Sequence, residues 1–161
     1  MSKRSLVLVV SAFMFAAISA VAFARSASNH PFTATSRLAS VFTSKTYPAI
    51  GSTSEDAVIT DFHPGGRSAG ISDSKVTGMS GGGVTFTTKD TDYTAKGLRF
   101  STTRGTAIIH ADGSASLRGS GRYTGGTGAF KGLTGTFTFT GTLPKVTGSV
   151  LTLHVRGNQR Y

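Results

Sequence analysis

Side chains capable of catalysis are sparse in this chain and widely spaced. Cysteine is absent, which excludes thiolate nucleophiles, zinc–thiolate sites and iron–sulfur clusters. Asp61 is the one acidic residue in an otherwise apolar stretch, residues 57–62. If strand alternation turns it inward beside Ile59, burial would raise the pKa of its carboxyl group and make it a catalytic acid or base. If it faces outward, it is an ordinary solvated carboxylate.

The histidines show no spacing typical of a metal site. Two of them, with Asp61, could converge in a barrel and bind a metal, because distant strands become neighbours. The simpler interpretation places all of them at the surface or at strand ends, and we predict no metal and no other cofactor. The four are His30, His63, His110 and His154.

Short motifs resemble catalytic or ion-binding signatures without the context that these need. G-x-S-x-G occurs at residues 66–70 and 78–82, but no helical periodicity follows either copy, as a nucleophile elbow requires. Asp90 and Asp92 resemble the start of a calcium loop, yet the remaining ligands of such a loop are missing. We therefore predict a turn at residues 90–92 and no hydrolase.

The first 24 residues have the pattern of a cleavable signal peptide. Lys3 and Arg4 precede an uncharged, mostly apolar run at residues 6–24, which ends in a small-x-small cleavage site at residues 22–24. An uncleaved membrane anchor is the alternative, because the run is nearly long enough to span a bilayer. We expect a secreted or periplasmic protein.

The composition of the remaining chain indicates one all-β domain. Its 137 residues carry 15 Lys and Arg against 7 Asp and Glu. All 21 glycines lie at or after Gly51, and threonine is abundant. Glycine disfavours helices, whereas threonine suits a pleated sheet. Without cysteine, the fold must depend on packing and hydrogen bonds.

Strand and turn signals divide this part into two zones. Residues 25–54, rich in Ser, Thr and Ala, are predicted to be a flexible arm with at most a strand near residues 40–43. Residues 55–161 alternate strand and turn patterns at the spacing of a sandwich or barrel. Asp112-Gly113 predicts a tight type I′ hairpin. About seven or eight strands result, enough to close an antiparallel barrel.

Alternation also predicts which side chains line the interior. In residues 134–143, Phe137 and Phe139 share one face with glycines, and threonines occupy the other. The glycines leave room for curvature or for a neighbouring ring. The same pattern places Leu117, Tyr123 and Phe100 on inward faces. We predict that these five side chains line a cavity for a small hydrophobic ligand.

The basic residues are spread evenly along the chain. No block of adjacent charges occurs, so we predict no sequence-specific nucleic-acid binding. Arg118 and Arg122 share one strand face, and Arg99 and Arg104 are expected to join them from neighbouring strands. Such a patch would attract an anionic polysaccharide, lipid headgroups or an acidic partner; the alternative is a merely solubilising surface.

The segment GGTGAFKGLTG, residues 125–135, resembles the glycine-rich motif of dirigent proteins and their allene oxide cyclase-like relatives. The Asp112–Ser114 turn, Gly119 and Gly121 fit the same superfamily, and the likeness spans residues 106–143. The resemblance implies an eight-stranded barrel with an apolar central cavity, often assembled as a trimer. Plant members direct phenol radical coupling or cyclise a fatty-acid epoxide. No catalytic carboxylate can be matched, so only the fold is carried over.

These patterns favour an exported barrel that binds a small hydrophobic molecule without catalysis. One alternative is a surface or matrix protein that binds anionic polymers through Arg118 and Arg122. The other is a dirigent- or cyclase-like enzyme that uses Asp61.

Overall fold

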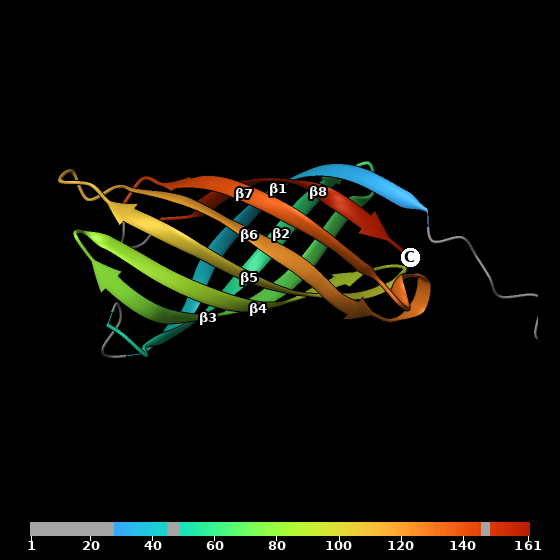
Figure 1. Ribbon diagram of the computed structural model, residues 1–161, viewed down its shortest axis with the longest axis horizontal. Helices are drawn as coiled ribbons and strands as arrows, with labels where there is room; N and C mark the ends of the chain where they lie inside the picture. The colour runs from blue at the N-terminus through green and yellow to red at the C-terminus, as the bar shows by residue number, and fades with distance from the viewer. Residues whose placement is uncertain (1–27, 45–48, 146–148) are drawn as a thin grey trace, which may run out of the picture.

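The described residues form a closed antiparallel barrel (Figure 1). The computed structural model describes residues 28–44, 49–145 and 149–161. Eight strands follow in chain order, and the last pairs with the first, which confirms the predicted fold class. They are β1 (Asn29–Thr43), β2 (Thr53–His63), β3 (Gly66–Ser80), β4 (Gly83–Thr94), β5 (Gly97–Ile109), β6 (Ala115–Gly126), β7 (Thr134–Leu143) and β8 (Leu151–Arg160). A short helix, η1 (Gly128–Phe130), connects β6 and β7.

The N-terminal part of the described chain corrects the prediction of a flexible arm. β1 is a full barrel strand that pairs with both β2 and β8. Its inward residues Phe32, Ala34 and Ser36 are all buried. The Ser- and Thr-rich composition concealed this strand, because a partly polar barrel interior accepts serine on its inner face. The predicted signal peptide, residues 1–24, lies outside the described residues, and within them no helix has the length and hydrophobicity to cross a membrane.

Alternation along β7 places its aromatic side chains in the barrel interior, as predicted. Phe137 and Phe139 both line the interior, and Phe139 is 4% exposed. The five threonines of the strand face outward and are exposed. Burial of each phenylalanine contributes about 1.5–3 kcal/mol to folding.

Glycines on β6 make room for these two rings. Gly119 pairs with Phe139 and Gly121 pairs with Phe137. A Cβ atom at Gly119 would lie 2.5 Å from Cζ of Phe139, and one at Gly121 would lie 2.5 Å from Cε2 of Phe137. Both separations are far below van der Waals contact. The predicted role of inward glycines, to admit a neighbouring ring, is confirmed.

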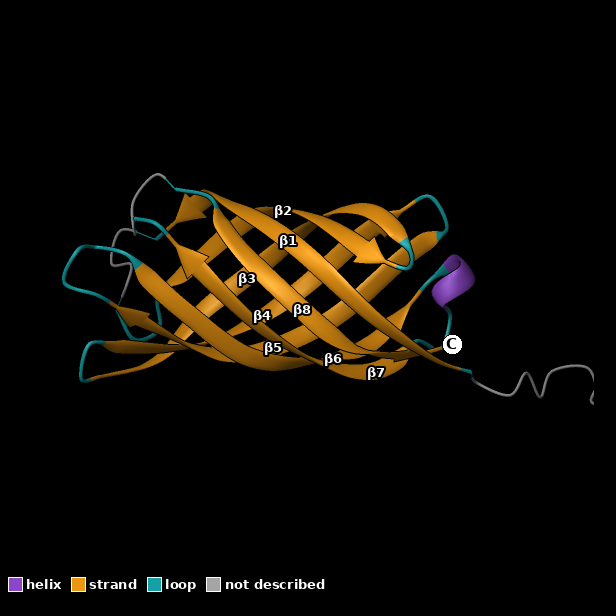
Figure 2. Cartoon of the chain, turned by 90° about the horizontal axis from the view of Figure 1, so that it is seen from above, coloured by secondary structure: helices purple, strands orange, loops and turns teal. Residues whose placement is uncertain are grey.

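The two ends of the barrel differ, as Figure 2 shows. η1 and the residues after it fold across one end, which we call the plugged end. There Phe130 and Leu133 are 8% and 1% exposed, so the cover is part of the core. The opposite end, the mouth, carries the β1–β2, β3–β4, β5–β6 and β7–β8 connections. The buried cluster at the plugged end consists of Phe32, Ala34, Phe62, Tyr123, Phe130 and Leu133.

The glycine-rich motif at residues 125–135 forms this plug. Gly128 has φ +59°, a conformation that residues with a Cβ rarely adopt. A Cβ there would also collide with the carbonyl oxygen of Lys96 in the neighbouring β4–β5 turn. Glycine therefore lets the segment turn tightly against that hairpin and place Phe130 over the barrel end.

The hairpin between β5 and β6 occurs at the predicted dipeptide but with another turn type. Gly113 has φ +80°, whereas no residue other than glycine has a positive φ among those described. A type I′ turn needs positive φ at both central residues, so Asp112 excludes it. Instead the N–H of Gly113 donates to the carbonyl of His110 at 3.0 Å, within a longer loop, residues 110–114.

Candidate functional site

A cavity of about 650 Å³ occupies the barrel interior. Side chains from all eight strands line it. Near the mouth the lining includes Thr43, Ile109 and Val150, which are exposed, so the cavity opens to solvent there. At the other end the cluster around Phe62 and Phe130 closes the barrel. The volume falls within the range of pockets that enclose a small organic molecule.

The part of the cavity nearer the mouth has an apolar wall. Side chains from most strands contribute, and Phe86 and Phe139 lie with ring centroids 6.4 Å apart. Such a wall offers burial of apolar surface but few hydrogen bonds, so it suits a hydrocarbon or aromatic group. The wall includes Val58, Val84, Phe86, Ala107, Leu117, Phe139, Leu151 and Leu153.

The structure brings together four of the five side chains predicted to line the cavity. Leu117, Tyr123, Phe137 and Phe139 all contribute to the lining. Phe100 does not, and this corrects the prediction. Its strand neighbours Arg99 and Ser101 are 5% and 8% exposed and point inward, so alternation turns Phe100 outward.

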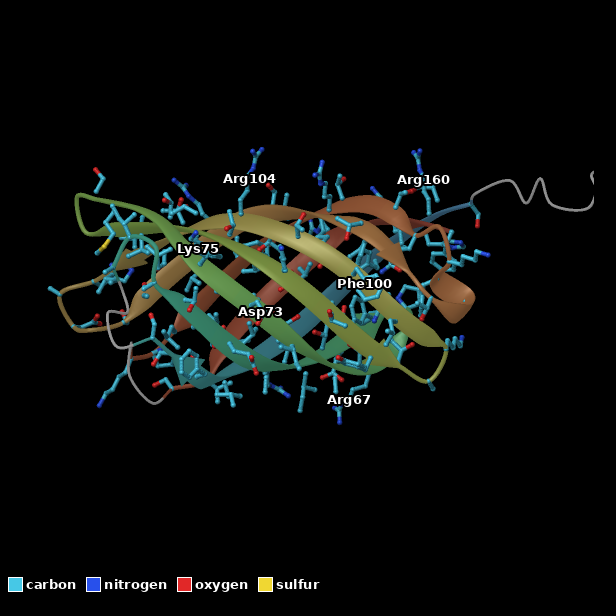
Figure 3. All side chains as sticks on the ribbon, turned by 90° about the horizontal axis from the view of Figure 1, so that it is seen from below. Arg67, Asp73, Lys75, Phe100, Arg104 and Arg160 are labelled. Carbon is cyan, nitrogen blue, oxygen red and sulfur yellow. The ribbon has the colours of Figure 1, made fainter. Side chains whose placement is uncertain are left out.

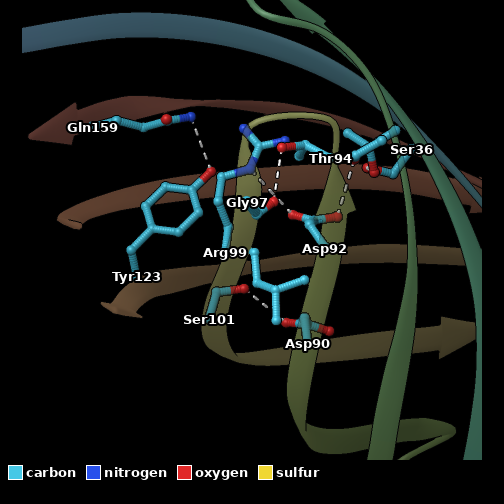
Figure 4. A network of polar contacts seen from close by, with 12 residues as sticks. Ser36, Asp90, Asp92, Thr94, Gly97, Arg99, Ser101, Tyr123 and Gln159 are labelled. Atoms are coloured by element: carbon cyan, nitrogen blue, oxygen red, sulfur yellow. Dashed lines mark hydrogen bonds and ion pairs between the residues drawn. The ribbon is translucent and has the colours of Figure 1, made fainter. Parts of the chain in front are cut away.

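Two carboxylates lie deeper in the cavity, toward the plugged end. Asp90 and Asp92 point into the barrel from the same face of β4 (Figure 4). They belong to the strand, which extends to Thr94, so the predicted turn at residues 90–92 is wrong. We call this pair the acidic layer.

Hydroxyl groups surround Asp90. Its carboxylate accepts hydrogen bonds from Ser72 Oγ at 2.6 Å, from Thr88 Oγ1 at 2.9 Å and from Ser101 Oγ at 3.1 Å. Burial raises the pKa of Asp90, and the three hydroxyl donors only partly offset this effect. Asp90 is thus a largely desolvated acceptor that is held by hydroxyl groups on its own strand and on the two neighbouring strands, β3 and β5.

Asp92 has fewer partners. Ser68 Oγ donates to it at 3.2 Å, and Arg99 Nε lies 3.9 Å from its Oδ2. Burial raises the pKa of Asp92 despite the opposing charge of Arg99. One hydrogen bond and a distant ion pair leave Asp92 with unused acceptor capacity next to the cavity.

Arg99 is held by aromatic rings as well as by charge. Its Cζ lies 3.7 Å from the ring centroid of Phe62 and 5.1 Å from that of Phe130. The faces of these two rings attract the positively charged guanidinium and keep it at the plugged end. Its Nε is buried without a hydrogen-bond partner among the described residues.

A tyrosine completes the polar end of the site. The Tyr123 hydroxyl accepts a hydrogen bond from Gln159 Nε2 at 3.2 Å (Figure 4). Burial raises the pKa of Tyr123, so the phenol stays neutral and keeps its proton as a hydrogen-bond donor. Tyr123 also contacts Phe137, with ring centroids 5.3 Å apart, and so joins the acidic layer to the apolar wall.

The cavity carries more negative than positive charge. Asp56, which accepts a hydrogen bond from Ser40 Oγ at 2.6 Å, adds a third carboxylate to the lining, and burial raises its pKa too. The one cation in the cavity lining is Lys75, which is exposed, and among the described residues Arg99 is the one buried cation. The interior therefore favours groups that donate hydrogen bonds or carry positive charge, and it disfavours anions.

Asp61, the candidate catalytic acid, lies on the outer surface. Arg67 Nε donates to it at 2.7 Å, and this hydrogen bond lowers the pKa of Asp61. The inward orientation that would have raised its pKa is not adopted, because Phe62 and Thr60 occupy the inner face of β2. Asp61 takes no part in the cavity.

The histidines are exposed and none lines the cavity. His30 stacks on Tyr161, with ring centroids 5.0 Å apart, and His110 is 2.8 Å from Ser116 Oγ. Within residues 28–44, 49–145 and 149–161, no three His, Cys, Asp or Glu side chains cluster as metal ligands would.

A second feature is the outer surface of β5 to β8, which we call the basic face. These four strands contain no acidic residue. Within the described residues, none of its arginines forms an ion pair. Arg99, predicted to belong here, is buried inside the barrel instead. The exposed arginines of the basic face are Arg104, Arg118, Arg122, Arg156 and Arg160.

The acidic layer escaped sequence analysis, although a signal for it was present. Val84 and Phe86 alternate inward, and the same alternation continues through Thr88, Asp90 and Asp92. The acidic residues suggested a turn, but β4 continues because seryl and threonyl hydroxyls on adjacent strands satisfy them. That pairing depends on register and is invisible in a single strand.

No protein-family model, curated protein or solved structure matches the chain.

Proposed function

We propose that this barrel binds an amphipathic small molecule. The apolar body of the ligand lies against the wall near the mouth, and its polar end reaches the acidic layer. The observation that carries this proposal is a cavity of about 650 Å³, open at one end, with the half-buried Asp90 and Asp92 toward its far end. Asp92 accepts one hydrogen bond, from Ser68, so a ligand group that donates a second one would compensate for its desolvation.

The charge of the cavity selects the class of ligand. A hydroxyl group or a protonated amine satisfies Asp92, whereas a carboxylate would be repelled by three acidic side chains. We therefore expect long-chain alcohols or amines to bind more tightly than fatty acids of the same length. A buried hydrogen-bonded charge distinguishes such ligands by about 1.5–3 kcal/mol, or roughly tenfold to a hundredfold in affinity.

Displacement of an apolar fluorescent dye tests the proposal. Ala107→Phe fills the apolar part of the cavity and should abolish displacement, whereas Thr106→Phe, on the outer face of the same strand, should not. Asp92→Asn should reduce the preference for amines over carboxylates, and Asp61→Asn is its surface control. Equal dye binding by both phenylalanine variants would refute an interior site.

The basic face supports a second candidate function, binding of an anionic polysaccharide. Arg104 and Arg156 lie in one cross-strand row, separated by Ser120 and Thr138, and Arg118 lies in the next row. Regular rows of cations with hydroxyl groups between them suit a polymer of repeated negative charges. The absence of acids on these strands leaves the positive potential uncancelled.

Charge reversal separates this function from ligand binding. Arg118→Glu combined with Arg122→Glu should abolish salt-dependent retention on an anionic polysaccharide column. Lys75→Glu combined with Lys89→Glu makes the same change in net charge on β3 and β4 and should reduce retention far less. Equal losses would indicate that net charge alone, and not the basic face, causes retention.

We also propose that the fold is related to the dirigent and allene oxide cyclase-like superfamily. The support is the eight-stranded barrel with an interior cavity and the use of the glycine motif as its plug. A cyclase- or coupling-type activity through Asp61 is disfavoured by the outward position of that side chain. Unchanged ligand binding by Asp61→Asn is the expected result.

A further inference from the structure

The mouth of the barrel is surrounded by exposed apolar side chains. In an antiparallel barrel of this order, the ends of odd-numbered strands and the starts of even-numbered strands meet at one end. Seven large apolar side chains that the described residues expose lie there, and we call them the rim. They are Val41, Phe42, Ile50, Met79, Ile108, Ile109 and Val150, with exposures of 37–69%.

The rim is not a by-product of folding. Its members come from four places: the end of β1 with the following loop, the end of β3, the end of β5, and the residue before β8. Connections of this kind are normally polar, and a contiguous exposed apolar surface generally marks a binding site. At the plugged end, by contrast, the cover buries Phe130 and Leu133.

The rim is continuous with the cavity. Ile109 and Val150 belong to both the rim and the cavity lining, so the rim adjoins the entrance to the cavity. Because the other end is plugged, a ligand enters through the rim. A ligand with a long apolar body is concentrated in lipid rather than in water.

Charges near the mouth favour a lipid surface over a second copy of the chain. The cations on the strands and the loop next to the rim are Lys75, Lys89, Arg104, Arg118 and Lys145, and the acidic residues on the outer surface there are Glu55, Asp73 and Asp112. The balance is positive, as suits anionic headgroups around an inserted apolar group. Two copies joined at their mouths would place these cations together and would close the entrance.

We propose that the rim docks the barrel, mouth first, onto an anionic lipid surface from which the cavity is loaded. The direction of loading rests on the proposed ligand function, but docking itself does not. The apolar side chains insert at the boundary between headgroups and acyl chains, and the neighbouring Lys and Arg side chains contact the phosphates.

Tryptophan fluorescence tests the docking, because the chain contains no tryptophan. Ile108→Trp places a single probe on the rim, and Ile71→Trp places one on the outer face of β3, at a similar exposure of 40% against 43%. With vesicles of phosphatidylcholine and phosphatidylglycerol, only the rim probe should shift to the blue and be quenched by brominated acyl chains. Equal quenching of both probes, or of neither, would overturn the proposal.

Matched serine variants test whether the rim drives binding. Ile50→Ser with Ile108→Ser should weaken vesicle binding about tenfold or more, because two apolar side chains no longer insert. Ile59→Ser with Ile71→Ser, which changes two isoleucines that are 49% and 40% exposed and lie away from the mouth, should leave binding unchanged. If the rim variant instead abolishes self-association seen without vesicles, a second copy covers the rim and docking on lipid is refuted.

Ligand binding in the cavity and docking of the rim on lipid can be refuted independently of each other. Ala107→Phe should lose dye displacement yet keep the vesicle response, because the rim is intact. The rim variant should keep displacement of the dye by a soluble short-chain amine. Loss of vesicle binding in Ala107→Phe would mean that an occupied cavity, and not the rim, contacts the lipid.

Discussion

The plugged end and the mouth of this barrel use similar side chains for opposite purposes. At the plugged end, aromatic and aliphatic groups are buried under η1, and Phe130 and Leu133 are nearly inaccessible. At the mouth, Phe42, Ile50 and Ile108 are exposed. The difference arises from the connections: the β6–β7 segment, in which Gly128 and Gly132 have positive φ, folds back over its end of the barrel. Between the two ends, charged side chains such as Arg104 and Arg160 point away from the barrel wall (Figure 3).

Removing the plug should have the largest effect on stability. Phe130→Ala deletes a buried ring that packs against Tyr161 and Arg99, and we expect a loss of about 3–5 kcal/mol in the free energy of unfolding. Phe42→Ala, the matched change at the mouth, should cost no more than about 0.5 kcal/mol. Urea unfolding measures both, and equal losses would remove the proposed difference between the ends.

The buried cation under the plug should matter almost as much. Arg99→Met leaves the half-buried Asp92 without its charged partner, and we expect a loss of about 3 kcal/mol in the free energy of unfolding. Adding Asp92→Asn should restore most of this loss, because the uncompensated charge is gone. A double variant no more stable than Arg99→Met would show that stacking on Phe62, rather than the ion pair, holds the arginine.

A smaller loss of stability is expected for a change in the middle of the barrel, at Gly119. Gly119→Ala forces a methyl group against the ring of Phe139 and the backbone of Arg104, which should cost about 1–3 kcal/mol. Ser120→Ala, the adjacent outward position, is its control and should be nearly neutral. Thermal unfolding of the two variants provides the comparison, and an equally small effect of both would show that the interior adapts.

The smallest effect concerns pH. Burial raises the pKa of Asp90 and Asp92 above the ordinary value of 3.8, so the folded state binds protons more tightly than the unfolded chain. Between those raised values and 3.8, stability should therefore increase as pH falls. The lowered pKa values of Asp61 and Asp112 have the opposite effect on the pH dependence of stability, but both carboxylates lie on the outer surface, where solvent weakens this effect. Unfolding of Asp90→Asn as a function of pH should show a weaker dependence than the parent; an unchanged slope would contradict this assignment.

Strand alternation was predictable wherever one face was uniformly apolar. Phe137 and Phe139 were placed correctly because glycine and threonine flank them in strict order. The same logic failed for Phe100, because the partners that let Arg99 and Ser101 lie inside come from β2, β4 and the plug. A buried charge is compatible with its strand only when distant residues satisfy it, and no local pattern reveals them.

The amino-acid sequence by itself determined the all-β class, the inward face of β7 and the role of glycine beside large rings, since each follows from the local chemistry of one or two adjacent strands. Only the tertiary structure decided that Asp90 and Asp92 face a cavity, that Asp61 does not, and that one end is covered while the other is open. Those properties depend on strand register and barrel closure, which bring residues from distant strands within hydrogen-bonding distance.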